Sequence, residues 1–344
     1  MPPGSSSTGN QAAQVERLQI SIESDRADVI PPPTVVAATG SIIFRVVSTV
    51  IDLGLSLLEM PRSKNALVEV GTKFLSCAAN FDHIYEDSPG NMIWWVEVFL
   101  SKLRSSFPPI VLTNRLAGEG FMLRANWGLG STKMEQWDPK KAGKLSLNKM
   151  IIEHLIRAGE VISNPGQRRV DYLPAYEGFL FIMATTVAHE MVHLFIGFLT
   201  GYRSPDTPKE VTFLAPLYND LIATSTRIGE SGRMWESLVF GGAIETAEDI
   251  SNPLGVYQAG TLYLVNDQRE VQAINRSCVT RFLNNPNQDF HFPMQTNGSS
   301  ISLHDFVRTY RSMEEVRLSI LSPELVQEIR RGTSRRNTIR QRSL

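Results

Sequence analysis

The apolar stretch Phe179-Leu-Phe-Ile-Met-Ala-Thr-Thr-Val-Ala-His189-Glu190-Met-Val-His193-Leu-Phe-Ile-Gly-Phe-Leu-Thr-Gly201 contains two histidines four residues apart. Residues at this spacing on an α-helix lie one above the other, with their Cβ atoms about 5–6 Å apart. The imidazoles of His189 and His193 can therefore reach one metal ion, and Glu190 can reach a water on the open side of that ion. Two histidine ligands and a base for water are what a hydrolytic zinc site requires.

The same stretch is predicted to form a buried helix. Pro174 suits its first turn, and Gly201 suits the position just past its end. Because the residues between them are apolar nearly all round, the helix belongs in a core, where unpaired polar groups are costly. A metal would satisfy His189, Glu190 and His193. The alternative is a chance match on a core helix whose histidines make ordinary hydrogen bonds.

The composition is that of an ordinary globular protein. The 344 residues are 42% hydrophobic and 20% charged, which is enough to bury a sizeable core. A net charge of −1 gives no general attraction to nucleic acid or to an anionic membrane. Cys77 and Cys278 are far apart and lack metal-type spacing. We therefore expect reduced thiols and no disulfide framework.

The sequence predicts a cytoplasmic protein. Residues 1–10 have neither a basic start nor an apolar run, so a signal peptide is not expected. Residues 177–201 are long enough to span a membrane, and intramembrane metalloproteases place such a motif in lipid. Those enzymes need several spans, and the other apolar stretch, residues 41–58, carries Arg45 and Asp52. We therefore expect no membrane partner.

The predicted fold class is α+β, mainly helical, with a small sheet flanking the metal helix. Residues 1–35 are polar and end in three prolines, so we expect a disordered tail. Residues 36–107 read as a helical region packed on the core, and residues 108–325 as the domain of the metal site. Residues 326–344 form a basic tail, which we expect to be solvated.

The element pattern is helical first and then mixed. We expect helices over Ile42–Leu58, Ala66–Ala79, Met92–Leu103, Lys149–Gly159, Ile301–Leu321 and Pro323–Arg331, and strands over Ile110–Thr113, Phe121–Trp127 and Leu145–Leu147, with a hairpin of Tyr257–Val265 and Glu270–Ile274. An edge strand beside the metal helix could pair with an extended substrate. His154, on the helix before the metal helix, is interpreted as a structural histidine.

A third ligand must come from outside the metal helix. Residues Gly229 to Phe240 are predicted to form a three-turn helix that is closed by the glycine pair Gly241-Gly242. Its two glutamates, Glu230 and Glu236, are six residues apart. Six helical residues turn through about 600°, so the two side chains point about 120° apart and cannot both bind one ion.

Glu230 is the favoured ligand, because Gly229 and Gly232 allow its backbone to approach the metal helix closely. Glu236 is the alternative ligand, with His291 or an aspartate as further options. If Glu230 binds the metal, Glu236 could accept the outer N–H of a histidine or pair with Arg233. Both glutamates could instead lie on a solvated helix face.

A histidine pair followed by a glutamate-bearing segment resembles the gluzincin branch of the zincin metallopeptidases. The resemblance rests on residues 189–193 and, more loosely, on residues 229–242. The run from Gly229 to Gly242 is also similar to a segment of fungal proteins of unassigned function. Met234 stands where known gluzincins carry a second acid, four residues after the ligand glutamate.

The resemblance implies a zincin-like domain in which His189, His193 and Glu230 hold Zn²⁺ and Glu190 acts as the general base. A catalytic member would also need a donor for the oxyanion that forms during the reaction. The candidates are Tyr202, Tyr218, Tyr257, Tyr263, His291 and Tyr310.

Three functions follow from this pattern. The first is a zinc-dependent hydrolase, most simply a metallopeptidase with a peptide substrate. The second is a zinc enzyme that acts on a small molecule in a biosynthetic pathway. The third is a non-catalytic interaction module with a zincin fold, against which the intact Glu190 argues. No nucleic-acid partner is expected, and the sequence does not predict an oligomeric state.

Overall fold

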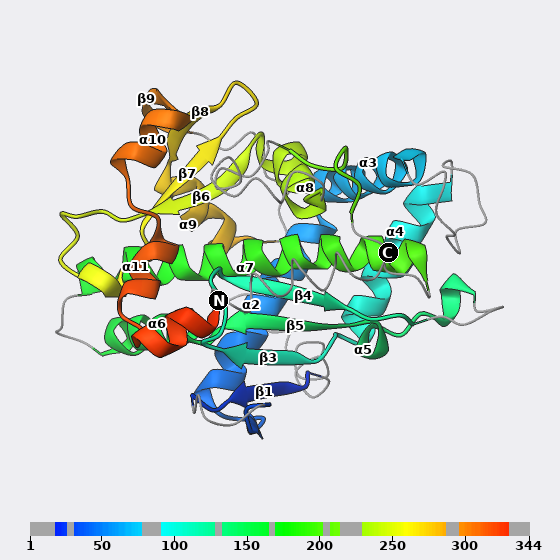
Figure 1. The fold of residues 1–344 in the computed structure, drawn as a ribbon, viewed down its shortest axis with the longest axis horizontal. Coiled ribbons are helices and arrows are strands. Elements are labelled where there is room, and N and C mark those ends of the chain that lie inside the picture. Colours follow the sequence, from blue (N-terminus) through cyan, green and yellow to red (C-terminus); the bar gives the residue numbers. More distant parts are fainter. Residues whose placement is uncertain are drawn as a thin grey trace, which may run out of the picture.

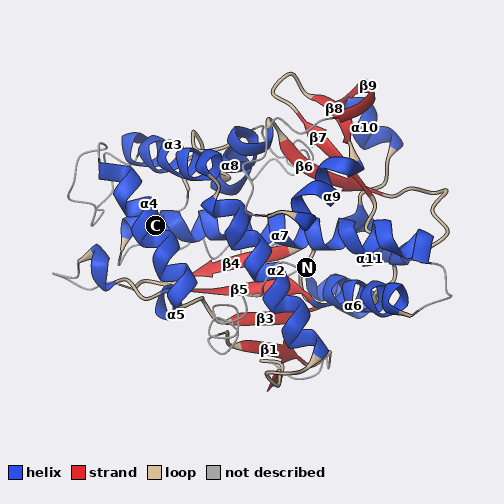
Figure 2. Ribbon diagram, turned by 180° about the vertical axis from the view of Figure 1, so that it is seen from behind, coloured by secondary structure: helices blue, strands red, loops and turns tan. Residues whose placement is uncertain are grey.

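One long helix, α7 (Arg169–Thr200), runs through the middle of the protein (Figure 1). The computed structural model describes residues 18–25, 31–77, 91–127, 133–164, 169–201, 207–213, 229–286 and 296–329. A five-stranded sheet lies on one side of α7, and a four-stranded sheet lies on the other (Figures 1 and 2). The fold is therefore α+β and mainly helical, which confirms the predicted class.

The other elements fall into two groups. The helices are α2 (Ile42–Glu59), α3 (Pro61–Cys77), α4 (Met92–Ser105), α5 (Pro139–Ala142), α6 (Lys149–Ser163), α8 (Ser231–Phe240), α9 (Arg276–Asn284), α10 (Leu303–Thr309) and α11 (Met313–Ser319), with 3₁₀ turns η2 (Met134–Gln136) and η3 (Gly255–Tyr257). The strands are β1 (Ile20–Glu23), β2 (Thr34–Val36), β3 (Ile110–Thr113), β4 (Gly120–Arg124), β5 (Gly143–Asn148), β6 (Ala243–Ala247), β7 (Thr261–Val265), β8 (Glu270–Ile274) and β9 (Thr296–Ser302).

The five-stranded sheet has the order β2-β1-β3-β5-β4. Its three middle strands are parallel, and the two edge strands β2 and β4 run antiparallel to their neighbours. All four residues of β3 are buried, as expected for an inner strand covered on both faces. The edge strand β4 lies next to α7 in both views (Figures 1 and 2).

The expectation of disorder over residues 1–35 is wrong where the structure describes them. β1 pairs in parallel with β3, with Ile20 opposite Ile110 and Ile22 opposite Leu112, and Ile20 is fully buried. The sequence gives no clear strand signal here, because the surrounding residues are polar and only one of the four side chains of β1 is buried. A strand this short becomes stable by adding to a sheet that already has a core.

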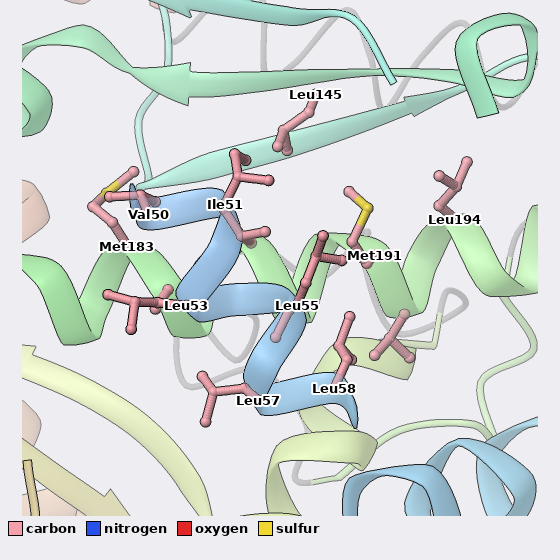
Figure 3. Close-up of a cluster of buried hydrophobic side chains, with 14 of the residues drawn as sticks. Val50, Ile51, Leu53, Leu55, Leu57, Leu58, Leu145, Met183, Met191 and Leu194 are labelled. Atoms are coloured by element: carbon pink, nitrogen blue, oxygen red, sulfur yellow. The ribbon is translucent and has the colours of Figure 1, made fainter. Parts of the chain in front are cut away.

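α2 packs directly against α7 and crosses it on the face seen in Figure 2. Figure 3 shows side chains of α2, α7 and β5 meeting in one buried cluster: Val50, Ile51, Leu53, Leu55, Leu57, Leu58, Leu145, Met183, Met191 and Leu194. The two helices approach closely at Gly54, where an added Cβ would lie 2.7 Å from Val187 Cβ and 2.9 Å from the Ala184 carbonyl oxygen.

α7 begins earlier than the sequence predicts. Pro174 is the sixth residue of the helix and not part of its first turn, whereas Gly201 ends it with φ of 73°. Among the described residues α7 is the one helix long and apolar enough to cross a membrane. In the most apolar window of α7, 83% of the residues are buried inside the protein. This burial is that of a core helix, as expected for this stretch.

The four-stranded sheet is antiparallel throughout, in the order β6-β7-β8-β9. β7 and β8 form the predicted hairpin, with Val265 opposite Val271, but its first strand begins at Thr261 and not at Tyr257, which lies in η3. The single helix predicted over residues 301–321 is wrong: β9 extends to Ser302, and α10 and α11 follow as separate helices. Ser302 and Ser312 each cap one of these helices through a side-chain oxygen, and such caps mark helix starts.

Replacing Gly54 by alanine should destabilise the fold. In an uncrowded helix the change would add about 1 kcal/mol of stability, but here the new methyl group meets α7 and should lower the free energy of unfolding by about 1–3 kcal/mol. Urea denaturation measures this difference. Gly40→Ala is the control, because nothing lies within 4 Å of the added Cβ at that position. A Gly54→Ala protein that is as stable as the parent would contradict the close packing of α2 on α7.

Candidate functional site

The imidazoles of His189 and His193 converge with the Glu230 carboxylate. Their Nε2 atoms are 3.3 Å apart, and Glu230 Oε2 lies 3.0 Å from His193 Nε2 and 3.8 Å from His189 Nε2. One donor atom from each of these residues lies within 4.8 Å of the others. Two nitrogens and one carboxylate oxygen thus face a common point, which is the donor set of a three-ligand zinc site.

The outer nitrogens of both imidazoles are held by residues of α8. Glu236 Oε1 lies 2.6 Å from His189 Nδ1, and its other oxygen accepts a hydrogen bond from the Ile244 backbone N–H at 3.2 Å. Ser231 Oγ lies 3.1 Å from His193 Nδ1. Such partners orient an imidazole and set which of its nitrogens carries the proton. Here they turn both Nε2 atoms towards Glu230.

Glu190 is held by the edge strand of the larger sheet. Its carboxylate Oε2 accepts a hydrogen bond from the Met122 backbone N–H at 2.6 Å, and its side chain is buried. β4 can come this close because a Cβ at Gly120 would lie 2.6 Å from Thr186 Cγ2. The sheet therefore positions the carboxylate that follows His189 on α7.

The charges of the cluster are strongly coupled. Burial opposes a charged imidazole, but the carboxylates of Glu236 and Glu230 outweigh it and raise the pKa of His189 to about 10. Burial also opposes a charged carboxylate at Glu230, yet His193 and His189 hold the pKa of Glu230 well below its usual value. The charged forms of His189 and Glu230 thus favour each other.

α8 begins later than the sequence predicts, and this changes the argument about its two glutamates. The helix starts at Ser231, and Glu230 is the preceding residue, with φ of −121° and ψ of 85°. The 120° separation predicted for two positions of one helix therefore does not apply. Glu230 reaches the inner side of His189 and Glu236 reaches its outer side, so the geometry favours Glu230 as the ligand, an assignment that stays a prediction.

A glycine allows α8 to sit against the histidines. A Cβ added at Gly232 would come closer to the ring of His189 than real Cβ contacts allow. This is the close approach that the sequence predicts for the glycines around Glu230. The other glycine, Gly229, does not pack on α7 but against the carbonyl oxygens of Pro208 and Val211.

The cluster opens into a cavity of about 550 Å³. Its walls are β4 with the turn before it, α7, the start of α8, and β6. Beyond the histidines the lining is charged: Glu119, Arg233, Glu245 and Glu314 all contribute. Arg233 Nη1 lies 2.7 Å from Glu245 Oε1, and Arg317 Nη1 donates to Glu119 Oε1 at 2.7 Å.

These charged residues are absent from the sequence prediction, except Arg233, which it named as one of two possible partners of Glu236. Arg233 pairs with Glu245 instead. Glu119 lies between two glycines and Glu245 lies within a short strand, and neither pattern marks a functional residue. Only the packing of β4, β6 and α11 around α7 brings them to one cavity.

The predicted oxyanion donors are not at the cavity where the structure describes them. Tyr257 packs on His154, and Tyr263 packs on Phe306 and Tyr310; none of these tyrosines lines the cavity. The candidates Tyr202, Tyr218 and His291 lie outside the described residues. Arg233, three residues after Glu230, is a cationic donor that does line the cavity.

His154 has the surroundings of a structural histidine. Its ring is 6.0 Å from the Phe179 ring and 5.0 Å from the Tyr257 ring. Burial, followed by repulsion from Arg317 and Arg157, lowers the pKa of His154 to about 4. The imidazole is therefore neutral at physiological pH, and it does not line the cavity.

The residues present fit a divalent ion such as Zn²⁺. His189, His193 and Glu230 offer donor atoms of the required types, and Glu236 and Ser231 supply the outer contacts that metal-binding histidines use. Glu190 lines the same cavity without belonging to the three-residue cluster. This separation of ligands from a free carboxylate is what metal-assisted hydrolysis requires.

Gly232→Ala should weaken zinc binding by at least about ten-fold, the effect expected when contacts that orient a ligand are disturbed. The added methyl group must displace the His189 ring or α8. Titration with zinc against a competing chelator measures the affinity, with circular dichroism to check the fold. Gly118→Ala is the matched control, because Gly118 lines the same cavity with nothing within 4 Å of its added Cβ. Equal affinities of the two variants would contradict this site geometry.

Comparisons of the chain with protein-family models, with curated proteins and with solved structures find no match. The chemical interpretation of the site therefore comes from the positions of its own side chains.

Proposed function

We propose that this protein is a zinc-dependent hydrolase, most simply a metallopeptidase. The observation that supports this best is that the two ring nitrogens of His189 have different partners. Glu236 Oε1 lies 2.6 Å from Nδ1, while Nε2 faces Glu230 and His193. Structural histidines that only make hydrogen bonds in a core do not need to point their Nε2 atoms at one place. A cluster that presents two Nε2 atoms and a carboxylate oxygen to one place is built to bind a cation.

In this proposal His189, His193 and Glu230 hold Zn²⁺, which when bound polarises the substrate and lowers the pKa of a water. Glu190 is the general base. Because its Oε2 is engaged by the Met122 N–H, the other oxygen, Oε1, takes the proton from the attacking water and later passes it to the leaving group. Burial of Glu190 keeps this carboxylate in one orientation.

An extended peptide is the substrate that the cavity suits best. β4 is the edge strand of its sheet, and Phe121 and Met122 line the cavity. A peptide lying along such an edge can add to the sheet through main-chain hydrogen bonds, while side chains enter the cavity. The reacting bond would then lie between β4 and α7, next to Glu190.

Removing the carboxylates of Glu230 and Glu236 one at a time should distinguish the metal ligand from the residue that orients His189. We expect about one zinc per chain in the parent, loss of the zinc in Glu230→Ala, and binding weakened by about 10–100-fold in Glu236→Ala, because Glu236 orients His189 without contacting the ion. Elemental analysis and zinc titration measure both effects. Loss of zinc from Glu236→Ala alone, with Glu230→Ala unchanged, would reverse the assignment.

Glu190→Gln should abolish most of the activity without removing the metal. Loss of a general base lowers turnover by about 10²–10⁴-fold, and the amide is close to the carboxylate in size, so zinc content should stay at the parental value. Cleavage of a fluorescence-quenched peptide library measures turnover. Glu69→Gln is the control, because Glu69 is exposed on α3. Parental activity in Glu190→Gln would exclude the proposed mechanism.

A further inference from the structure

Arg233 leaves α8 on the side that carries the histidine cluster. The Met234 N–H donates to the Glu230 carbonyl oxygen at 3.1 Å, so Glu230 accepts the first hydrogen bond of the helix. Arg233 follows Glu230 by three residues and precedes Glu236 by three, and side chains at this spacing are neighbours on a helix surface. Glu230 faces Nε2 of His189, and Glu236 faces Nδ1. The side chain of Arg233 therefore emerges between the two glutamates that contact this histidine.

One ion pair holds Arg233, and it uses a single nitrogen. Arg233 Nη1 lies 2.7 Å from Glu245 Oε1, and Glu245 is the one ion-pair partner of Arg233 within the described parts of the chain. A guanidinium has five N–H donors, so this contact leaves several of them over. The side chain of Arg233 is 24% exposed, and it lines the cavity. Its remaining donors are thus available to a ligand there.

The two other arginines of this region are less accessible. Arg124, at the end of β4, lines the cavity, but its side chain packs over Gly197 and its Nη1 atom is buried. Arg317 is only 3% exposed behind Glu119, and its Nε and Nη2 atoms are buried. For the residues that the structure describes, no nitrogen of Arg233 is among the buried atoms that lack a partner. Arg233 is therefore the guanidinium that is best placed to meet a ligand.

A negative charge in this cavity needs a cation beside it. Six glutamates line the cavity, and a further charge of the same sign is disfavoured among them. The carboxylate of Glu245, and then those of Glu236 and Glu230, raise the pKa of Arg233 above its usual value, although burial acts in the opposite direction. An arginine is charged at physiological pH even without such neighbours. Arg233 thus supplies a permanent positive charge.

Hydrolysis of a peptide bond creates a negative charge on the substrate. The water oxygen adds to the carbonyl carbon, a proton of the water passes to Glu190 Oε1, and the π electrons of the carbonyl move onto its oxygen, which becomes an oxyanion. When this electron pair returns, the C–N bond breaks and the proton passes from Glu190 to the leaving nitrogen. A donor aimed at the oxyanion accelerates the reaction. Tyr257, Tyr263 and Tyr310 do not line the cavity, so these predicted donors do not supply it.

We propose that Arg233 is a catalytic residue that donates a hydrogen bond to the carbonyl oxygen of the reacting bond and stabilises the oxyanion. The inference rests on the proposed hydrolase and names the donor that this reaction requires. Glu245 is then a positioning residue, because it holds Nη1 while the other nitrogens of the guanidinium meet the substrate. Since the contact strengthens as charge develops on the oxygen, Arg233 acts on turnover more than on substrate binding.

Binding of phenylphosphonate and of acetophenone tests this without turnover. Phenylphosphonate carries negatively charged oxygens on a tetrahedral centre, as the reacting group does, whereas acetophenone carries a neutral carbonyl. Isothermal titration calorimetry of the full-length protein with one equivalent of zinc measures both affinities. Arg233→Gln should weaken phenylphosphonate binding by at least about ten-fold, the contribution of one hydrogen bond between charged groups, and acetophenone binding by a smaller factor. Equal phenylphosphonate affinities of Arg233→Gln and the parent would overturn the inference.

A double substitution separates this role from a structural one. Arg233→Gln leaves the Glu245 carboxylate without its partner, whereas Arg233→Gln/Glu245→Gln removes both charges of the ion pair. We expect the double variant to bind phenylphosphonate as weakly as Arg233→Gln does. Parental affinity in the double variant would overturn the inference, because Arg233 would then serve only Glu245. If Arg233→Gln did not fold, the double variant would decide the question.

Arg308→Gln is the control for the loss of one positive charge. Arg308 lies exposed on α10 and does not line the cavity, so its replacement should leave phenylphosphonate affinity at the parental value. An equal loss of affinity in Arg308→Gln and Arg233→Gln would show a general effect of charge and would overturn the inference.

The two proposals can fail separately. With a cleavable peptide, Arg233→Gln should lower kcat by about 10²–10³-fold, the effect of losing an oxyanion donor, with zinc content and KM near the parental values. Cleavage that requires Glu190 but is unaffected by Arg233→Gln would keep the hydrolase and remove the role of Arg233. Phenylphosphonate binding that depends on Arg233, in a protein that cleaves no peptide, would keep an anion site at Arg233 and remove the hydrolase.

Discussion

The contact between α8 and the two histidines of α7 is the interaction on which the rest of the site depends. Both imidazoles emerge from a helix buried in the core, where an unpaired polar ring would be costly. Glu236 and Ser231 hold their outer nitrogens, so their inner nitrogens are left to face each other and Glu230. The contact is possible only because position 232 has no side chain. One glycine thus allows one helix to orient the functional groups of another.

The two sheets complete the site from opposite sides of α7. The larger sheet ends in β4, whose Met122 N–H holds Glu190. The smaller sheet begins with β6, which contributes the Ile244 N–H to Glu236 and the Glu245 carboxylate to Arg233. A backbone N–H fixed in a strand is a rigid donor, so both carboxylates keep one orientation. This pre-organisation is what an enzyme needs if its groups must act without rearrangement.

Two ion pairs hold charged side chains at the cavity in place. Arg317 is buried, and its guanidinium is paired with Glu119; Arg233 is paired with Glu245. Such ion pairs offset the cost of burying each partner.

Local patterns in the sequence determined the central helix, the spacing of His189, Glu190 and His193, and most of the helix and strand positions. These features depend on the helical repeat and on strand alternation, which act between residues close together in the chain. The same local rules placed the start of α7 five residues late, and they joined β9, α10 and α11 into one helix. The preference of proline for a first helical turn misplaced the start of α7 at Pro174, and apolar spacing alone does not reveal the caps at Ser302 and Ser312.

Only the tertiary structure decided which distant residues meet. It placed Glu230 before α8 and Glu236 within it, on opposite sides of His189. It added β1 to the larger sheet, and it brought Glu119, Glu245 and Glu314 to one cavity. Each of these results depends on pairing between segments far apart in the chain, for which a single carboxylate or a four-residue strand leaves no repeating signal. Chemistry that lies on one helix can be read from its spacing, whereas chemistry assembled from several elements depends on how they pack.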